Sequence, residues 1–148
     1  MKPMFRILLL ACVAALAASC CACRSYQKHT RRPLEGTRWQ LVQLDGQDVA
    51  CEPGRYTIAL HADDGTLAGT GDCNRLRGRY EATPERALRI GPLTSTRMAC
   101  PEGSREGKFL SVLQSATHYD MDGPLLLLLC DGEIKAVFQA QPDEGKAE

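Results

Sequence analysis

Residues 69–80, Gly-Thr-Gly-Asp-Cys-Asn-Arg-Leu-Arg-Gly-Arg-Tyr, are the stretch of the sequence that could carry chemistry. Cys73 is a candidate nucleophile or metal ligand. Arg75, Arg77 and Arg79 recur at every second position, and a β-strand would place them on one face. Guanidinium groups bind carboxylates and phosphates through paired hydrogen bonds. The stretch therefore fits a catalytic loop, a metal site, an anion-binding face or a structural link within a sheet.

Catalysis by Cys73 would need an imidazole beside a thiolate of low pKa. The histidines are His29, His61 and His118, and a pairing of Cys73 with His61 or His118 is conceivable. A disulfide at Cys73 would compete directly with that role. The sequence also lacks a nucleophilic serine turn, a phosphate-binding glycine loop and a paired-carboxylate signature. We therefore predict no catalytic residues and a protein that is not an enzyme.

A metal site has one partial signal in the sequence. Cys20-Cys-Ala-Cys23 has the Cys-x-x-Cys spacing of zinc ligands, but a second pair at such spacing is lacking. Lipidation of Cys20 would also remove one of the two thiols. We expect neither a metal ion nor any other cofactor.

The first twenty residues predict the compartment. Lys2 and Arg6 precede an apolar run at 7–19, which ends in small residues before Cys20. This is the pattern of a secretory signal peptide, and the run is too short for a comfortable membrane span. Residues 16–20 resemble a bacterial lipobox, in which the cysteine becomes the lipidated first residue. We predict a signal peptide at 1–19 and a lipid on Cys20.

Lipid on Cys20 would anchor the protein to a membrane of the bacterial cell envelope, since buried acyl chains bind it to the bilayer. The residue after Cys20 is a cysteine and not an aspartate, which favours the outer membrane. Residues 20–33 are polar, basic and without periodicity, as in a flexible tether that is solvated or lies against lipid headgroups. Residues 141–148 are polar and predict a disordered tail.

The charge balance argues against nucleic acid as a partner. The formal net charge of the whole chain is +0. Loss of Lys2 and Arg6 with the signal peptide would leave 16 of the 18 basic side chains against 18 acidic ones, a net charge of about −2. A slightly acidic chain has no overall attraction for a polyanion, so any anion binding must come from a local cluster.

Between the tether and the tail, at 34–140, most segments predict strands. They alternate apolar and polar residues and are separated by Asp-Gly pairs, a frequent signal for tight hairpin turns. The expected strands are 37–44, 56–62, 66–71, 74–80, 88–93, 117–121, 125–130 and 133–139. The run 125–129 is apolar throughout, which predicts a strand buried on both faces.

One helix is expected after residue 104. Ser104 suits the N-cap, and Glu106 lies in the first turn. An apolar stripe follows, made of Phe109, Leu110, Leu113 and Ala116. The fold class is therefore α+β, mainly β: a curved antiparallel sheet or partial barrel with one packed helix.

Eight cysteines occur in the chain. Cys12 would leave with the signal peptide and Cys20 would carry the lipid, which leaves six in an oxidising compartment where disulfides persist. Six cysteines allow 15 pairings, and spacing alone does not choose among them.

From Leu34 to about Gln139 the chain resembles the META domain, the fold of the HslJ type of heat-shock-inducible lipoprotein. The resemblance is carried by residues 71–80 and by Thr-Ser-Thr-Arg-Met-Ala-Cys-Pro at 94–101. The opening Leu-Glu-Gly-Thr-Arg-Trp-Gln-Leu at 34–41 and the pair Phe109-Leu110 also fit. Asp72 departs from the pattern, since many members have glycine there. The matching motif positions are Gly71, Asn74, Gly78, Tyr80 and Met98.

The resemblance implies that Cys73 and Cys100 lie close together, and in an envelope protein we expect a disulfide between them. Cys51 and Cys130 are a weaker candidate pair that the family pattern does not include. Cys73 would then be a structural link, and Asn74 would suit a bend because its side chain bonds nearby backbone groups.

The disulfide would also bring Arg97 near the other three arginines. Arg75, Arg77, Arg79 and Arg97 are our candidate binding residues, for a small anionic ligand or an acidic envelope protein. The alternative is a solvated face whose arginines pair with Glu81, Glu85 or Asp72.

The function predicted from the sequence is a non-enzymatic binding or scaffolding module of the envelope. The resemblance links it to envelope stress or antibiotic tolerance. Two alternatives remain open: an inhibitor or chaperone-like partner of an envelope enzyme, and a redox-active thiol protein.

Overall fold

The computed structural model describes residues 30–50 and 52–142. The expected signal peptide, Cys20, most of the tether, Cys51 and the end of the tail lie outside these residues. Within the described ranges, no helical segment has the length and hydrophobicity that a membrane span requires.

Eight strands follow one another through hydrogen-bonded neighbours in the order β6-β5-β4-β3-β1-β10-β9-β8, with every strand pairing antiparallel. Two short strands lie off this path, β2 beside β1 and β7 beside β5. The bounds are β1 Arg38–Leu44, β2 Gln47–Asp48, β3 Thr57–His61, β4 Thr66–Thr70, β5 Arg75–Ala82, β6 Leu88–Ile90, β7 Thr94–Ser95, α2 Glu106–Ser115, β8 His118–Asp122, β9 Leu125–Cys130 and β10 Glu133–Ala140.

The two ends of this sheet approach each other, so the sheet is nearly a closed barrel. Ala87, just before β6, forms a bridge with His118 of β8. The amide of Leu88 donates to the carbonyl of Thr117 at 2.9 Å. Closure satisfies backbone groups that an open sheet would leave at its edges. The predicted class, mainly β with a curved or barrel-like antiparallel sheet and one helix, is confirmed.

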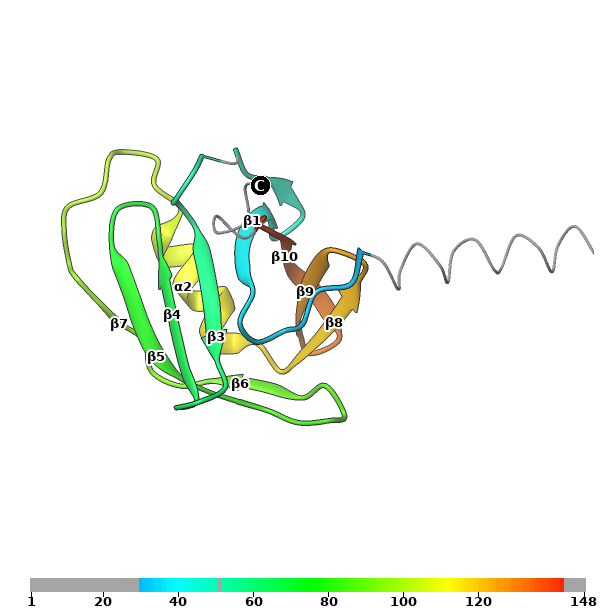
Figure 1. The fold of residues 1–148 in the computed structure, drawn as a ribbon. Helices are drawn as coiled ribbons and strands as arrows, with labels where there is room; N and C mark the ends of the chain where they lie inside the picture. Colours follow the sequence, from blue (N-terminus) through cyan, green and yellow to red (C-terminus); the bar gives the residue numbers. More distant parts are fainter. Residues whose placement is uncertain (1–29, 51, 143–148) are drawn as a thin grey trace, which may run out of the picture.

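Figure 1 shows α2 between the β3–β5 side of the sheet and the β8–β10 side. Phe109 of this helix is fully buried. Its ring lies edge-on to Tyr56, with centroids 5.4 Å apart, and 6.2 Å from Phe138. Burying an aromatic side chain of this size contributes roughly 1.5–3 kcal/mol to folding. Phe109 therefore fixes the N-terminal half of the helix against the sheet, close to the segment that contains Cys73.

The inward faces of the strands supply the rest of the core. Alternation places Leu76 and Tyr80 of β5 inward and its arginines outward. The largest fully buried side chains are Trp39, Phe109, Phe138, Leu41, Ile58, Leu60, Leu67, Leu88, Leu113, Leu126 and Leu128. The hydrophobic alternation seen in the sequence therefore sets which side chains remain on the outside.

Two local predictions were wrong in detail. The helix begins at Glu106 with Arg105 as N-cap, although the hydroxyl of Ser104 accepts a hydrogen bond from the Glu106 amide at 3.3 Å. Strand β9 is not buried on both faces: Leu126 and Leu128 are fully buried, whereas the intervening leucines are half-buried. The helix packs on the core side of this sheet and leaves its other face partly open.

Candidate functional site

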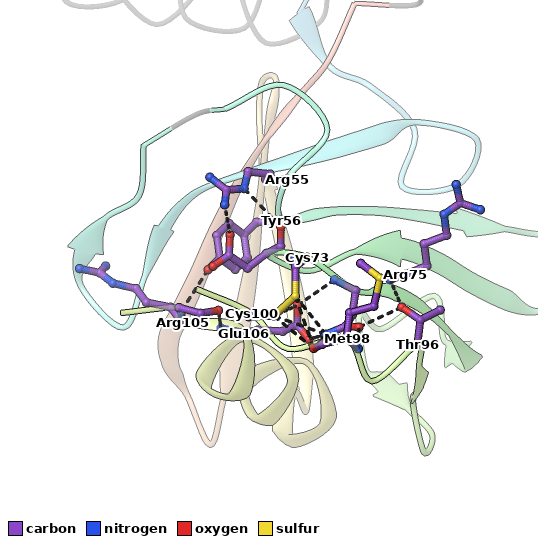
Figure 2. Close-up of a disulfide and its surroundings, with 12 residues drawn as sticks. Arg55, Tyr56, Cys73, Arg75, Thr96, Met98, Cys100, Arg105 and Glu106 are labelled. Atoms are coloured by element: carbon purple, nitrogen blue, oxygen red, sulfur yellow. Dashed lines mark hydrogen bonds and ion pairs between the residues drawn. A yellow bond between two sulfur atoms is a disulfide. The ribbon is translucent and has the colours of Figure 1, made fainter. Parts of the chain in front are cut away.

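The turn that leads into β5 is held by one carboxylate, that of Glu106 at the first residue of α2. Its Oε2 accepts the backbone N–H groups of Cys73 and Asn74, both at 3.1 Å. Its Oε1 accepts the side-chain amide of Asn74 at 2.5 Å. Glu106 is only 7% exposed, so these bonds form away from bulk water. The carboxylate therefore fastens the helix to the turn, as Figure 2 shows.

Asn74 connects the same turn to the segment after β7. It is 3% exposed. Its Oδ1 accepts the amide of Met98 at 2.6 Å and the hydroxyl of Thr96 at 2.9 Å. Its Nδ2 also donates to the carbonyl of Met98 at 3.2 Å. Asn74, a motif position of the resemblance to META domains, thus bonds through both the oxygen and the nitrogen of its side-chain amide.

The structure joins Cys73 and Cys100 by a disulfide, as the resemblance implies, with a Cα–Cα distance of 5.6 Å. The bridge closes a loop of sequence separation 27 that contains all of β5, β6 and β7. The disulfide, Asn74 and Glu106 therefore act on the same short region. We call Cys73, Asn74, Cys100 and Glu106 the clamp.

The pKa of Glu106 reflects this environment. Burial raises the pKa, but hydrogen bonds from the amide of Cys73, the side chain and amide of Asn74 and the amide of Asp72 outweigh it and hold the pKa below the ordinary value of 4.5. Glu106 is therefore ionised at neutral pH. A fixed anion 3.4 Å from the Cys100 sulfur would disfavour a thiolate there.

Gly71 makes room for the clamp. A Cβ atom on Gly71 would lie 2.5 Å from Oε2 of Glu106 and 2.8 Å from its Cδ. Because three hydrogen bonds hold the carboxylate, it cannot move away from the new Cβ without lengthening or breaking them. We expect Gly71→Ala to lower the free energy of unfolding by about 2 kcal/mol, as for an overpacked core, measured by chemical denaturation.

Gly107, one residue after Glu106, provides the control for that prediction. A Cβ at Gly107 would meet nothing within 4 Å. Gly107→Ala in the helix should raise the stability by roughly 0.5–1 kcal/mol. Equal stability of Gly71→Ala and the parent chain would show that Glu106 is not held as described.

Tyr80 and Gly78 have structural roles further along β5. The hydroxyl of Tyr80 donates to Glu35 at 2.6 Å, and the ring is 7% exposed. Burial and this partner raise the pKa of Tyr80. A Cβ on Gly78 would lie 2.7 Å from Cδ2 of Leu93, so the glycine permits close approach of the next segment. The side chain of Met98, the remaining motif position, is 59% exposed, and the backbone of Met98 bonds Asn74.

A catalytic or metal-binding role for Cys73, the alternative weighed from the sequence, would need a free thiolate. In the disulfide neither Cys73 nor Cys100 is a thiolate, so neither is a nucleophile or a metal ligand. Their sulfurs and a carboxylate oxygen of Glu106 do lie within 4.8 Å of one another. His61 and His118 are exposed at strand ends.

Cys130, the other half of the weaker disulfide prediction, is a free thiol in the structure. Its Sγ lies 3.3 Å from the hydroxyl of Ser115 and bonds the carbonyl of Val112. The pair with Cys51 is therefore not formed there, and Cys51 itself lies outside the described residues. The end of α2 and the end of β9 meet at this thiol, which is partly exposed.

The candidate binding arginines lie where the period of two predicted them. Arg75, Arg77 and Arg79 are all exposed on the outer face of β5. Opposite them on β4 stand only short neutral side chains: Thr70 faces Arg75, Ala68 faces Arg77 and Thr66 faces Arg79. Figure 2 shows Arg75 extending away from the disulfide.

Arg97 lies on the neighbouring segment, which the clamp holds against β5. The hydroxyl of Thr96, the residue before Arg97, accepts the amide of Arg75 at 3.2 Å. Arg97 is exposed and has a left-handed backbone conformation, with φ of 40°. Arg97 therefore directly follows a residue that is bonded to the backbone of β5.

The alternative, in which the β5 arginines pair with Glu81, Glu85 or Asp72, is not seen in the described part of the chain. Asp72 pairs with Arg55 at 2.8 Å, and Glu81 lies opposite Arg89 on β6. Within the described ranges, none of Arg75, Arg77, Arg79 and Arg97 makes an ion pair. The row on β5 therefore makes no ion pair there, although the carboxylate of Asp64 lies near enough to Arg77 for their charges to interact.

Comparison with known protein families identifies one family. The sequence model of the META domain matches residues 32–143. An NMR structure of a protein from Burkholderia xenovorans is 30% identical and covers 74% of this chain and 85% of that chain, with a TM-score of 0.57. A second NMR structure, 19% identical, covers 71% of this chain and 89% of that chain with a TM-score of 0.55, a likeness of fold. No curated protein matches the sequence.

Proposed function

The chain belongs to the META domain family, and from this premise we propose that it is a lipid-anchored envelope protein whose single domain recognises an anionic partner without catalysing a reaction. The observation that carries the proposal is the row of unpaired arginines on β5. Three guanidinium groups on one strand face, none of them in an ion pair within the described residues, are matched to an anionic surface.

The anchoring part of the proposal is supported by the sequence of residues 1–20. The basic start, the short apolar run and the small residues before Cys20 fit a lipoprotein signal. A lipid on Cys20 with the polar tether after it would hold the domain beside the outer membrane and leave it free to turn. The partner would then be another component of the envelope, in keeping with a role in envelope stress or antibiotic tolerance.

The non-catalytic part is supported by the clamp. The one motif that suggested a nucleophile uses its cysteine in a disulfide and its asparagine in backbone bonding. A redox-active thiol is less well supported, because the ionised Glu106 carboxylate beside Cys100 disfavours the thiolate that exchange requires. Structural use accounts for all four residues of the clamp.

The proposal is tested by capture from an envelope extract. The full chain is purified under oxidising conditions, immobilised and exposed to the extract, and bound proteins and lipids are identified by mass spectrometry. We expect a specific partner to be retained and to be lost when Arg75, Arg77 and Arg79 are all replaced by serine. The loss follows from removal of charge-assisted hydrogen bonds, each of which is worth about 1.5–3 kcal/mol.

A control with the same loss of charge separates a site from general electrostatics. Arg86→Ser, Lys108→Ser and Lys135→Ser together remove three positive charges from other faces, where they form exposed ion pairs of small value. The control should retain the partner. Retention by the triple β5 variant, or an equal loss in both variants, would overturn the proposed role of the β5 face.

The inhibitor or chaperone-like alternative would use the same face. It is distinguished by what is captured: a folded envelope enzyme in fixed stoichiometry indicates an inhibitor, and a mixture of unfolded chains indicates a chaperone. The β5 arginines are required in each case.

A further inference from the structure

The outer face of β5 carries a defined hollow as well as a row of charges. It has a volume of about 380 Å³, near the lower end of the range for small-ligand sites. Arg75 and Arg77 of β5 line it together with Ala68 and Gly69 of β4, and Thr94 and Thr96 complete its wall. Lining residues include no carboxylate. Small residues of β4 form its floor, and Ala68 is the residue opposite Arg77.

The backbone that carries the hollow is fixed on both sides. Strand β5 pairs with β4 along one edge and with β7 along the other, so neither arginine sits at a free sheet edge. The hydroxyl of Thr94 donates to the carbonyl of Arg77 at 3.0 Å, and that of Thr96 donates to Asn74. Asn74 belongs to the clamp. A ligand would therefore meet a preorganised wall and would have only the two guanidinium groups to order.

The charges of the hollow match a phosphate monoester. Side chains two residues apart on a strand are about 6.6 Å apart at the backbone, so two guanidinium groups can close on one ligand between them. A phosphate monoester carries a charge of roughly −1.5 to −2 and three terminal oxygens. Two guanidinium groups supply two positive charges and paired donors in the geometry that phosphate accepts. A carboxylate offers only one negative charge to the same pair.

We propose that the hollow between Arg75 and Arg77 is a binding subsite for a phosphate monoester, either a small soluble one or the headgroup of a lipid. The inference rests on the proposed recognition role of the β5 face and names the chemical group recognised there. Arg79 stands outside the hollow and opposite Thr66, so it adds to the local field without lining the site.

The test is a calorimetric titration of the full chain with glycerol 3-phosphate, and with acetate for comparison. We expect saturable binding of the phosphate ester and at least about tenfold weaker binding of acetate. The variant Arg75→Ser/Arg77→Ser should bind the ester about tenfold more weakly or not at all, because each lost charge-assisted bond is worth about 1.5–3 kcal/mol.

The matched control is Arg86→Ser/Arg89→Ser, which removes the same charge from exposed positions before and within β6, outside this hollow and outside the β5 row. It should change the affinity by less than about threefold, since only screened long-range attraction is lost. An equal loss in both double variants would overturn the subsite and leave a diffuse basic surface. Absence of saturable ester binding, in solution and on vesicles, would also overturn it.

Vesicles distinguish the two sources of the ester. The same variants are compared on phosphatidylcholine vesicles with and without phosphatidic acid, a lipid whose headgroup is a phosphate monoester. If the chain binds vesicles only when they contain phosphatidic acid, and this binding requires Arg75 and Arg77, the result supports the subsite with a lipid headgroup as its ligand. The chain could bind neither glycerol 3-phosphate nor phosphatidic acid vesicles while partner capture still requires the β5 arginines. The proposed subsite would then be wrong, and the proposed function would stand.

Discussion

Glu106→Gln is expected to lower the free energy of unfolding at neutral pH by about 3 kcal/mol, although it changes one atom of the side chain. The carboxylate accepts two backbone N–H groups and the Asn74 amide at a position only 7% exposed. A glutamine would turn a donor toward these donors and leave at least one of them unsatisfied, at a cost of about 1–3 kcal/mol for each group. Chemical denaturation at pH 7 measures the loss.

The same variant should show a weaker dependence of stability on acid. The pKa of Glu106 is below 4.5 in the folded chain because its hydrogen bonds outweigh burial. A lowered folded pKa stabilises the fold above the ordinary value, and this contribution disappears as the pH falls through the folded pKa. The difference between the parent chain and Glu106→Gln should therefore shrink below pH 4.5. A constant difference would contradict the ionised clamp.

Glu102→Gln is the control for the acid effect. Glu102 is exposed and precedes the helix by a few residues. Its replacement should change the stability by no more than about 0.5 kcal/mol, as is usual for surface positions. A loss comparable with that of Glu106→Gln would mean that general charge near the helix terminus, and not the clamp, sets the stability.

The second large effect is expected from the disulfide. Replacing Cys73 and Cys100 together by serine should lower the free energy of unfolding by about 3–4 kcal/mol, the chain-entropy value for a loop of separation 27. Reduction by a dithiol should reproduce this loss in the parent chain, measured in parallel denaturation curves. The loop entropy of the unfolded chain is the physical reason, since the cross-link excludes its most extended conformations.

Cys130→Ser is the matched control, because Cys130 is a free thiol and closes no loop. It should cost less than about 1 kcal/mol. Equal stability with and without reductant would contradict the structural role of the bridge. We further expect the Glu106 and disulfide effects to be non-additive, because both fix the same turn.

The sequence predicted most strands within two residues because alternation and Asp-Gly turns are local signals. Strand β5, expected at 74–80, spans Arg75–Ala82, and the outward position of its arginines follows from the period of two. Pairing of distant segments could not be predicted in this way. Strand β1 lies between β3 and β10, and no feature of its seven residues predicts that it pairs with those two strands. The closure between Ala87 and His118 depends equally on the whole fold.

The site was predictable to a smaller extent. The resemblance to META domains indicated Cys73, Asn74 and Cys100. For Glu106 the sequence indicates only an acidic residue in the first turn of the helix. The sequence gives little sign that Glu106 holds the turn, because a carboxylate at a helix N-terminus commonly stabilises its own helix through the helix dipole. That it reaches across to the amides of Cys73 and Asn74 depends on how the helix is docked. The hollow beside Arg77 also required the register, which sets Ala68 opposite it.

Cross-linking in intact cells tests the central claim, that the β5 face recognises a partner, most directly. A photoreactive phenylalanine analogue replaces Glu81, which is exposed on β5 two residues after Arg79. A second chain carries the analogue in place of Ile134, which is 49% exposed on β10. We predict an adduct from position 81 alone, lost when Arg75, Arg77 and Arg79 become serine. Equal adducts from both positions, or an adduct that survives loss of the three arginines, would contradict the claim.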